Sequence, residues 1–144
     1  MGHSYYELHY HLVWATRLRE PLIVAEIRNR LYACIREKCE QLGCRVHEVC
    51  GVQDHIHVAL SIPASVPVSK VVHGIKGSSS HLVNAEGIGM GLHWQPGYGA
   101  ITIRRKDVPI VQRYIREQEQ RHAEQRVWEG LEQMGQDGPS SVQG

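Results

Sequence analysis

The sequence lacks any apolar run near the roughly 20 residues that a membrane-spanning helix requires. Of its 144 residues, 42% are apolar, and the mean hydropathy is −0.35. Residues 1–12 do not show the basic segment followed by an apolar segment that is typical of a secretory signal. We therefore expect a cytosolic protein with one domain over residues 1–131. A flexible tail is expected over residues 132–144, whose end, GQDGPSSVQG, is typical of disorder.

The sequence also lacks a CxxC motif. Its four cysteines match no zinc-binding framework, and we interpret them as reduced structural thiols. The net charge is only +1, but it is unevenly distributed. Residues 117–144 hold two arginines against six carboxylates, whereas residues 1–116 hold 14 basic and nine acidic side chains. A basic body weakly favours a polyanionic partner.

The spacing of apolar residues predicts the element order β-α-β-β-α-β-α. This is the order of the ferredoxin-like split βαβ fold, followed by one extra C-terminal helix that carries Tyr114. The expected class is therefore α+β, with an antiparallel sheet that has helices on one face. Asp107 is a candidate N-cap for the last helix. The predicted strands cover residues 6–14, 44–52, 55–62 and 100–104, and the first two predicted helices cover residues 24–42 and 67–83. The third predicted helix follows Asp107, with Trp128 or Leu131 as its candidate end.

Histidine is abundant, with ten residues where ~2–3 would be ordinary. The pair His55 and His57 lies in the motif Asp54-His55-Ile56-His57. Residues i and i+2 of a strand share a face, so two imidazoles side by side could form half of a divalent-metal site. The alternative is a pair of surface histidines without a ligand. The segment 9–11, HYH, has the same spacing.

A tyrosine and a glutamine have the spacing of one helix face. Tyr114 and Gln118 are four residues apart, so both side chains could reach the same point. The hydroxyl is a candidate nucleophile and the amide oxygen a candidate metal ligand. The alternative is a tyrosine packed in the core beside an incidental glutamine, and spacing alone favours that alternative.

Basic and hydroxyl side chains near both motifs could bind phosphate, although a solvated charged face is the alternative. A basic patch beside a tyrosine and a candidate metal fits phosphodiester chemistry better than it fits a hydrolase for neutral substrates. The candidate DNA-binding residues are Lys70, Lys76, Ser78, Ser79, Arg104, Arg105, Lys106 and Arg113.

Four blocks of the sequence, in this order, resemble the single-tyrosine HUH transposases of small bacterial insertion sequences and their REP-associated relatives. The blocks cover about residues 9–122. DHIH before an apolar strand, with YIxxQ about 60 residues later, is far more specific than either motif alone. The blocks are HYHLVWATRLR, GVQDHIHVALSIP, VSKVVHGIKGSSS, and WQPGYGAITI followed by VQRYIREQEQRH.

The resemblance implies a DNA transposase that cleaves and rejoins single-stranded DNA through a 5′-phosphotyrosine intermediate. His55, His57 and Gln118 match the ligands of a divalent metal, Mg²⁺ or Mn²⁺, and Tyr114 matches the catalytic tyrosine. No nucleotide cofactor is implied. Lys76-Gly77-Ser78-Ser79 matches a block that helps contact DNA. The pair in HYH lies outside the metal ligands, and we interpret it as a decoy.

The resemblance also implies the partners and the location. The expected protein is a bacterial cytoplasmic homodimer that acts on single-stranded DNA with hairpin ends, without a membrane, and its active sites could be completed in trans. Three alternatives stay open. They are a domesticated relative that processes REP hairpins, a non-catalytic nucleic-acid-binding ferredoxin-like domain, and a small metallohydrolase in which Tyr114 is structural.

Overall fold

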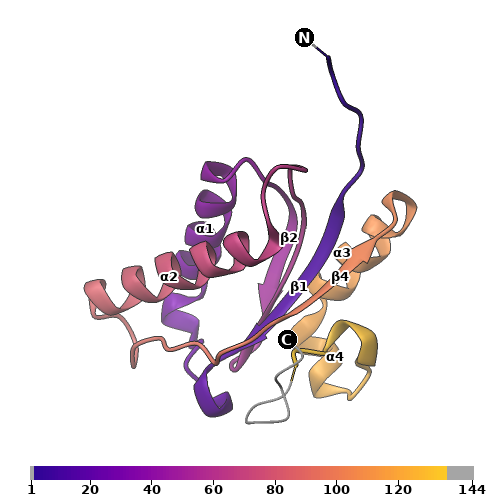
Figure 1. Cartoon of the computed structure of the whole chain (residues 1–144). Helices are drawn as coiled ribbons and strands as arrows, with labels where there is room; N and C mark the ends of the chain where they lie inside the picture. The colour runs from indigo at the N-terminus through magenta and orange to yellow at the C-terminus, as the bar shows by residue number, and fades with distance from the viewer. Residues whose placement is uncertain (1, 136–144) are drawn as a thin grey trace.

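The computed structural model describes residues 2–135. The first six main elements follow the predicted order, and two short helices come after them (Figure 1). Short 3₁₀ turns are η1 (Arg17–Arg19), η2 (Arg105–Asp107) and η3 (Glu129–Leu131). The strands and helices are β1 (His9–Ala15), α1 (Ala25–Gln41), β2 (Arg45–Gly51), β3 (His55–Ser61), α2 (Val68–Glu86), β4 (Gly99–Ile103), α3 (Val108–Arg116) and α4 (Gln118–Ala123).

The four strands form one sheet in the order β2-β3-β1-β4, and every neighbouring pair is antiparallel. In each βαβ unit, the two strands are separated in the sheet by a strand of the other unit: β3 lies between β1 and β2, and β1 lies between β3 and β4. The predicted ferredoxin-like α+β architecture is therefore confirmed. The hairpin of β2 and β3 closes through Val52, whose N–H donates to the carbonyl of His55 at 3.1 Å.

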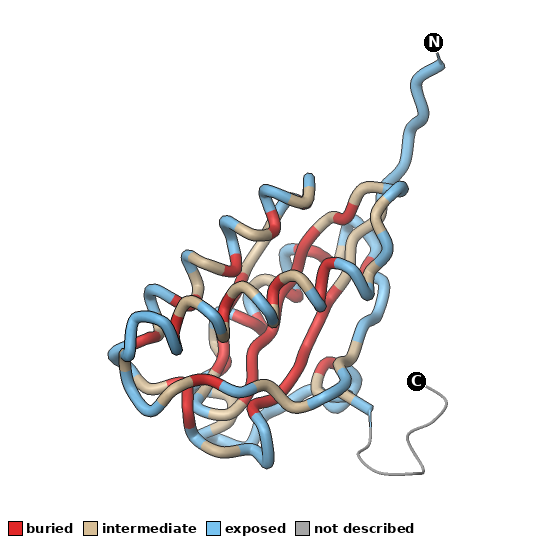
Figure 2. The backbone as a smooth tube through the Cα atoms, turned by 60° about the vertical axis from the view of Figure 1, so that its left-hand side comes forward, coloured by how far each residue is buried: buried red, intermediate tan, exposed pale blue. Residues whose placement is uncertain are grey.

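The sheet has two differently packed faces. Leu12, Trp14 and Ile56 point to one face, where they pack with residues of α1 and α2 in the main core. On the other face, Ala59 packs with Tyr114 and Ile115 of α3 in a smaller cluster. Figure 1 shows α1 and α2 on one side of the sheet and α3 on the other, and Figure 2 shows buried residues concentrated along the central strands.

The last helix is shorter than predicted. The single helix expected from Asp107 to Trp128 or Leu131 ends at Arg116, and α4 stops at Ala123 before a 3₁₀ turn. Helices in proteins are stabilised mainly by burying an apolar face, and after Ile115 the chain offers no apolar residue but Ala123 until Val127. Asp107 does not cap α3 with its side chain, which instead accepts a 2.9 Å hydrogen bond from Arg104 Nε.

The tail expected over residues 132–144 is only partly covered by the structure. Residues 136–144 lie outside the described residues, whereas Glu132 is half-buried and reaches the histidines of β3. All four cysteines are free thiols, as the sequence predicted. Within residues 2–135, the helices are too short or too polar to cross a membrane.

Two glycines give a test of the packing around the hairpin. A Cβ on Gly51 would overlap the carbonyl oxygen of His55, whereas a Cβ on Gly77 in α2 would meet no atom within 4 Å. We expect Gly51→Ala to lower the free energy of unfolding by about 1–3 kcal/mol, because the overlap moves the strand. Gly77→Ala should raise it by up to about 1 kcal/mol through helix propensity.

Urea denaturation of both variants measures these changes. A Gly51→Ala protein as stable as the parent would show that the hairpin is loosely packed at this point.

Candidate active site

The site is built on the first residues of β3. His55 and His57 share the sheet face that α3 covers, with 1% and 0% of their surfaces exposed. Their rings meet edge to face, with centroids 5.0 Å apart. The structure therefore places the two imidazoles of the DHIH motif side by side and away from solvent.

Two further side chains join this pair. The ligand-capable atoms of His55, His57, His122 and Glu132 all lie within 4.8 Å of one another. The Nε2 atoms of His55 and His122 are 3.1 Å apart. The Glu132 carboxylate lies 3.3 Å from Nε2 of His55 with one oxygen and 3.3 Å from Nε2 of His57 with the other. We call these four residues the histidine–glutamate cluster.

The donor set fits a divalent ion. The Nε2 of His57 is buried and makes no hydrogen bond with any described residue, although the Glu132 carboxylate lies nearby. Three imidazole nitrogens and a carboxylate are ligands that Mn²⁺, Zn²⁺ and similar ions accept, whereas Mg²⁺ prefers oxygen. His55 also has the orienting partner typical of metal ligands, since its Nδ1 lies 2.8 Å from the Asp54 carboxylate.

Gln118 lies beside the cluster. It is fully buried, and its Oε1 is 3.0 Å from Nε2 of His122. Its amide nitrogen donates to the carbonyl of Tyr114 at 3.3 Å. The break between α3 and α4 falls at Glu117, yet Gln118 still faces the site as the spacing predicted.

Tyr114 is held next to the cluster by its ring and its hydroxyl. The hydroxyl donates to the Glu132 carboxylate and accepts from the Trp128 N–H at 2.9 Å. The ring stacks on Trp128 with centroids 4.6 Å apart, and the Arg121 guanidinium lies 5.0 Å from both ring centroids. Its edge-to-face contact with His57 spans 5.9 Å. The tyrosine has no exposed surface in this state.

The charges of the site explain its pKa values. Burial, reinforced by the Glu132 carboxylate, raises the pKa of Tyr114 to about 12. Burial opposes charge on Glu132, but the imidazoles of His55 and His57, each 3.3 Å away, outweigh it and hold the pKa of Glu132 well below its usual range. Asp54 and Glu132 likewise outweigh burial and raise the pKa of His55. Burial lowers the pKa of His57.

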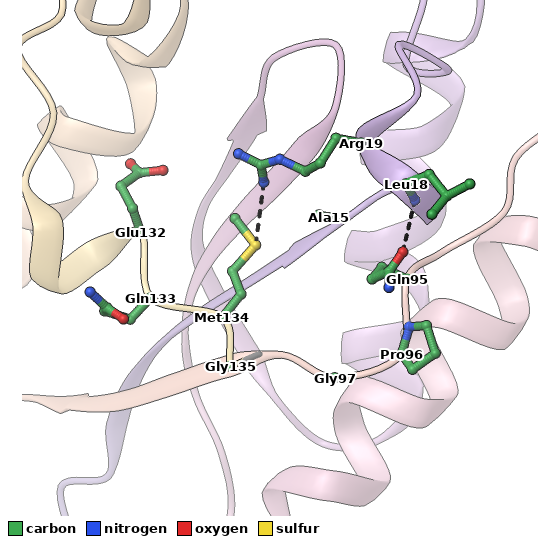
Figure 3. A pocket seen from close by; sticks show the side chains of 10 residues that line it. All are labelled: Ala15, Leu18, Arg19, Gln95, Pro96, Gly97, Glu132, Gln133, Met134 and Gly135. Carbon is green, nitrogen blue, oxygen red and sulfur yellow. Dashed lines mark hydrogen bonds between the residues drawn. The ribbon is translucent and has the colours of Figure 1, made fainter. Parts of the chain in front are cut away.

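A cavity of about 340 Å³ borders the cluster (Figure 3). Its walls are η1, the segment 95–97 before β4, and the segment 132–135. Arg19 reaches across to Met134 at 3.6 Å, and the Leu18 N–H donates to the Gln95 side chain at 2.8 Å. Residues 132–135 therefore form one wall of this cavity.

The predicted DNA-binding residues divide into two groups on elements that cover opposite faces of the sheet. On α2, Ser79 is buried, donates to the Ile75 carbonyl at 2.7 Å and accepts from Trp94 at 2.9 Å. Lys76 donates to the carbonyls of Gln95 and Gly97 at 2.8 and 2.7 Å. Both side chains are engaged within the protein. Ser78 is partly buried, and the exposed members are Lys70, Arg104, Arg105, Lys106 and Arg113.

Sequence reasoning missed two members of the cluster. His122 follows Gln118 by four residues, just as Gln118 follows Tyr114, and this repeated spacing could have indicated it. Glu132 lies in a segment without apolar periodicity, and no local pattern singles it out among the acidic residues there.

Comparisons with known proteins relate the chain to one group. It matches the family model described as "Transposase IS200 like" over residues 4–118. It is 28% identical over 124 residues to the ISDra2 transposase TnpA of Deinococcus radiodurans, covering 81% of this chain and 89% of that relative. It is 29% identical over 124 residues to the transposase for insertion sequence element IS200 of Salmonella typhimurium, covering 82% and 81%.

Solved structures share the fold. A crystal structure of a Deinococcus radiodurans protein assigned as a transposase has a TM-score of 0.64 at 25% identity, covering 82% of this chain and 96% of that chain. A REP-associated tyrosine transposase bound to a REP hairpin has a TM-score of 0.60 at 19% identity, covering 88% and 75%. The family match ends at residue 118, so His122, Trp128 and Glu132 lie beyond it.

The Glu132 carboxylate should control the acidity of Tyr114. We expect Glu132→Gln to lower the pKa of Tyr114 from about 12 toward 10, because removal of a nearby negative charge favours the phenolate. Carbon-13 NMR of labelled tyrosine, assigned with Tyr114→Phe, measures this value in the metal-free protein. The exposed Glu129 lies in the same segment, and Glu129→Gln is the control. Equal pKa values in the parent and Glu132→Gln would contradict the electrostatic account.

Proposed function

We propose, from the premise that this chain belongs to the IS200-like transposase family, that it cleaves and rejoins single-stranded DNA through a covalent bond to Tyr114. One observation carries this proposal. The Tyr114 hydroxyl lies beside the histidine–glutamate cluster, because the Glu132 carboxylate accepts its hydrogen bond and also faces the imidazoles of His55 and His57. A nucleophile beside a set of metal ligands is an arrangement that can catalyse phosphodiester cleavage.

The proposed step balances without an energy source. The Tyr114 oxygen attacks phosphorus, the bond from phosphorus to the 3′-oxygen breaks, and the strand leaves with a 3′-hydroxyl. The hydroxyl proton passes to water, because Glu132, its hydrogen-bond partner in the covered state, lies on the segment that moves away before the reaction. The 5′-phosphotyrosine link conserves the energy of the broken bond, so a 3′-hydroxyl can reverse the reaction without ATP.

The cluster supports a metal-assisted version of this step. His55, His57 and His122 would hold a divalent ion, with Gln118 as the oxygen donor once Glu132 has moved away. Such an ion, when bound, would polarise the phosphate and neutralise its charge. Three imidazoles favour Mn²⁺ over Mg²⁺, so of the two ions expected from the sequence we propose Mn²⁺.

The proposal assigns substrate contacts to exposed basic side chains. Lys106 lies just before α3 and Arg113 lies in its last turn, and both are exposed, where they could bind the DNA backbone. Single-stranded DNA with hairpin ends is the proposed substrate. Tyr114 lies against His57 of the same chain, with ring centroids 5.9 Å apart. The homodimer, assembly in trans and the cytoplasmic location stay predictions.

The buried tyrosine adds a structural requirement. DNA cannot reach Tyr114 while Trp128 stacks on its ring and Glu132 lies between its hydroxyl and the imidazoles. A phosphate would need the position that this carboxylate fills. The covering segment buries Leu131, whereas Trp128 keeps 39% of its surface exposed. We propose that residues 128–135 move away before the reaction.

Weakening this cover should therefore speed cleavage. Trp128→Ala removes an aromatic stack worth about 0.5–1.5 kcal/mol, so single-turnover cleavage should become about two- to tenfold faster. The neighbouring Val127 is also exposed, and Val127→Ala should cleave at the parent rate. Slower cleavage by Trp128→Ala, with unchanged DNA binding, would show that Trp128 supports the reactive state instead of covering it.

Covalent capture tests the reaction itself. The full chain is mixed with labelled single-stranded DNA from the flanks of its own gene, with Mn²⁺ or with EDTA, and separated under denaturing conditions. A DNA adduct is expected only for the parent with Mn²⁺, and Tyr114→Phe and His55→Ala should form none while still binding DNA. Absence of an adduct from a folded, DNA-binding parent would favour a non-catalytic nucleic-acid-binding domain.

A further inference from the structure

The histidine pair on β1 has no part in the proposed step, yet its two members have different surroundings. His9 lies near the end of the sheet, 3.1 Å from His47 and 2.9 Å from Ser61. His11 lies two residues further along the same face and is 1% exposed. The sequence interpretation treated both as a decoy, and the structure separates them.

His11 contacts one of the candidate ligands directly. Its Nε2 is 2.8 Å from Nδ1 of His57, and the ring centroids are 5.0 Å apart. The strand register explains the contact. His57 pairs with Val13, and His11 precedes Val13 by two residues, so the two imidazoles meet diagonally on one face.

This contact bears on which nitrogen of His57 can bind an ion. Its Nε2 faces the Glu132 carboxylate and the rest of the cluster, so this nitrogen must present a lone pair to a cation. A neutral imidazole then carries its proton on Nδ1. That N–H points at Nε2 of His11, which must be a lone pair to accept it.

The other strand ligand has an equivalent partner. Nδ1 of His55 lies 2.8 Å from the carboxylate of Asp54. Each imidazole of the DHIH motif therefore has its own hydrogen-bond partner at Nδ1, which is the Asp54 carboxylate for His55 and the His11 imidazole for His57. Loss of such a partner typically costs 10–100-fold in metal affinity, because the ligand loses its tautomer and its orientation.

We propose that His11 is a positioning residue of the metal site. Its Nε2 accepts the Nδ1–H of His57 and leaves Nε2 of His57 free to bind a divalent cation. This inference rests on the proposed function, since it supposes a cation at the cluster. A histidine with only a packing role could be replaced by an apolar residue of similar size, whereas a positioning residue requires a hydrogen-bond acceptor.

Titration calorimetry with Mn²⁺ on the full chain distinguishes these roles. His11→Leu should bind Mn²⁺ about 10–100-fold more weakly than the parent. His11→Gln should recover most of this loss, because the amide oxygen supplies an acceptor. His9→Leu is the matched control on the same strand and face, and it should bind like the parent. Equal affinity of His11→Leu and the parent would overturn the proposal.

Nitrogen-15 NMR of the Zn²⁺-loaded parent gives a second readout that needs no variant to fold. We expect the shared proton on Nδ1 of His57, with a scalar coupling through the hydrogen bond to Nε2 of His11. A proton on Nε2 of His11 would overturn the proposal. A parent that takes up neither ion would instead overturn the proposed metal site, which keeps the two failures distinguishable.

Discussion

The antiparallel pairing of β1 with β3 is the constraint on which the site depends. It sets Val13 opposite His57 and Ala15 opposite His55. Because side chains alternate across a strand, both imidazoles point toward α3, while Ile56 between them enters the core under α1 and α2. A slip of one residue would put Ile56 in the site and the imidazoles among aliphatic side chains. The apolar core therefore determines where the ligands point.

A balanced set of buried charges occupies the space between the sheet and the C-terminal segment. A buried carboxylate is costly unless it is hydrogen-bonded or paired, and here the Tyr114 hydroxyl donates to Glu132 while the imidazoles of His55 and His57 lie 3.3 Å from it. A phosphodiester also carries one negative charge and offers two oxygens. Exchange of the carboxylate for a phosphate would therefore preserve the charge balance of the cluster. In the covered state the imidazoles face the Glu132 carboxylate, and in the open state that the proposed reaction needs they would face a phosphate of the same charge.

The strands and the faces of their side chains could be predicted from the alternation of apolar residues in the sequence. Contacts between residues distant along the chain could not. Alternation indicated the strands, and it placed His55 and His57 on one face, as the structure has them. The prediction of one long last helix was wrong, because the charged and polar residues after Ile115 give such a helix no apolar face to bury. Glu132 was assigned to the tail, because its role depends on a return of the chain that no local spacing reveals. His11 was assigned as a decoy, because a diagonal contact across two strands requires the register.

The most direct test of this account is the position of a divalent ion in crystals of the full chain soaked with Mn²⁺. Anomalous scattering locates the ion independently of the protein atoms. The account predicts a peak within bonding distance of Nε2 of both His55 and His57, on the side of the sheet that carries Tyr114. Crystals that take up Mn²⁺ elsewhere, with this point empty, would contradict it.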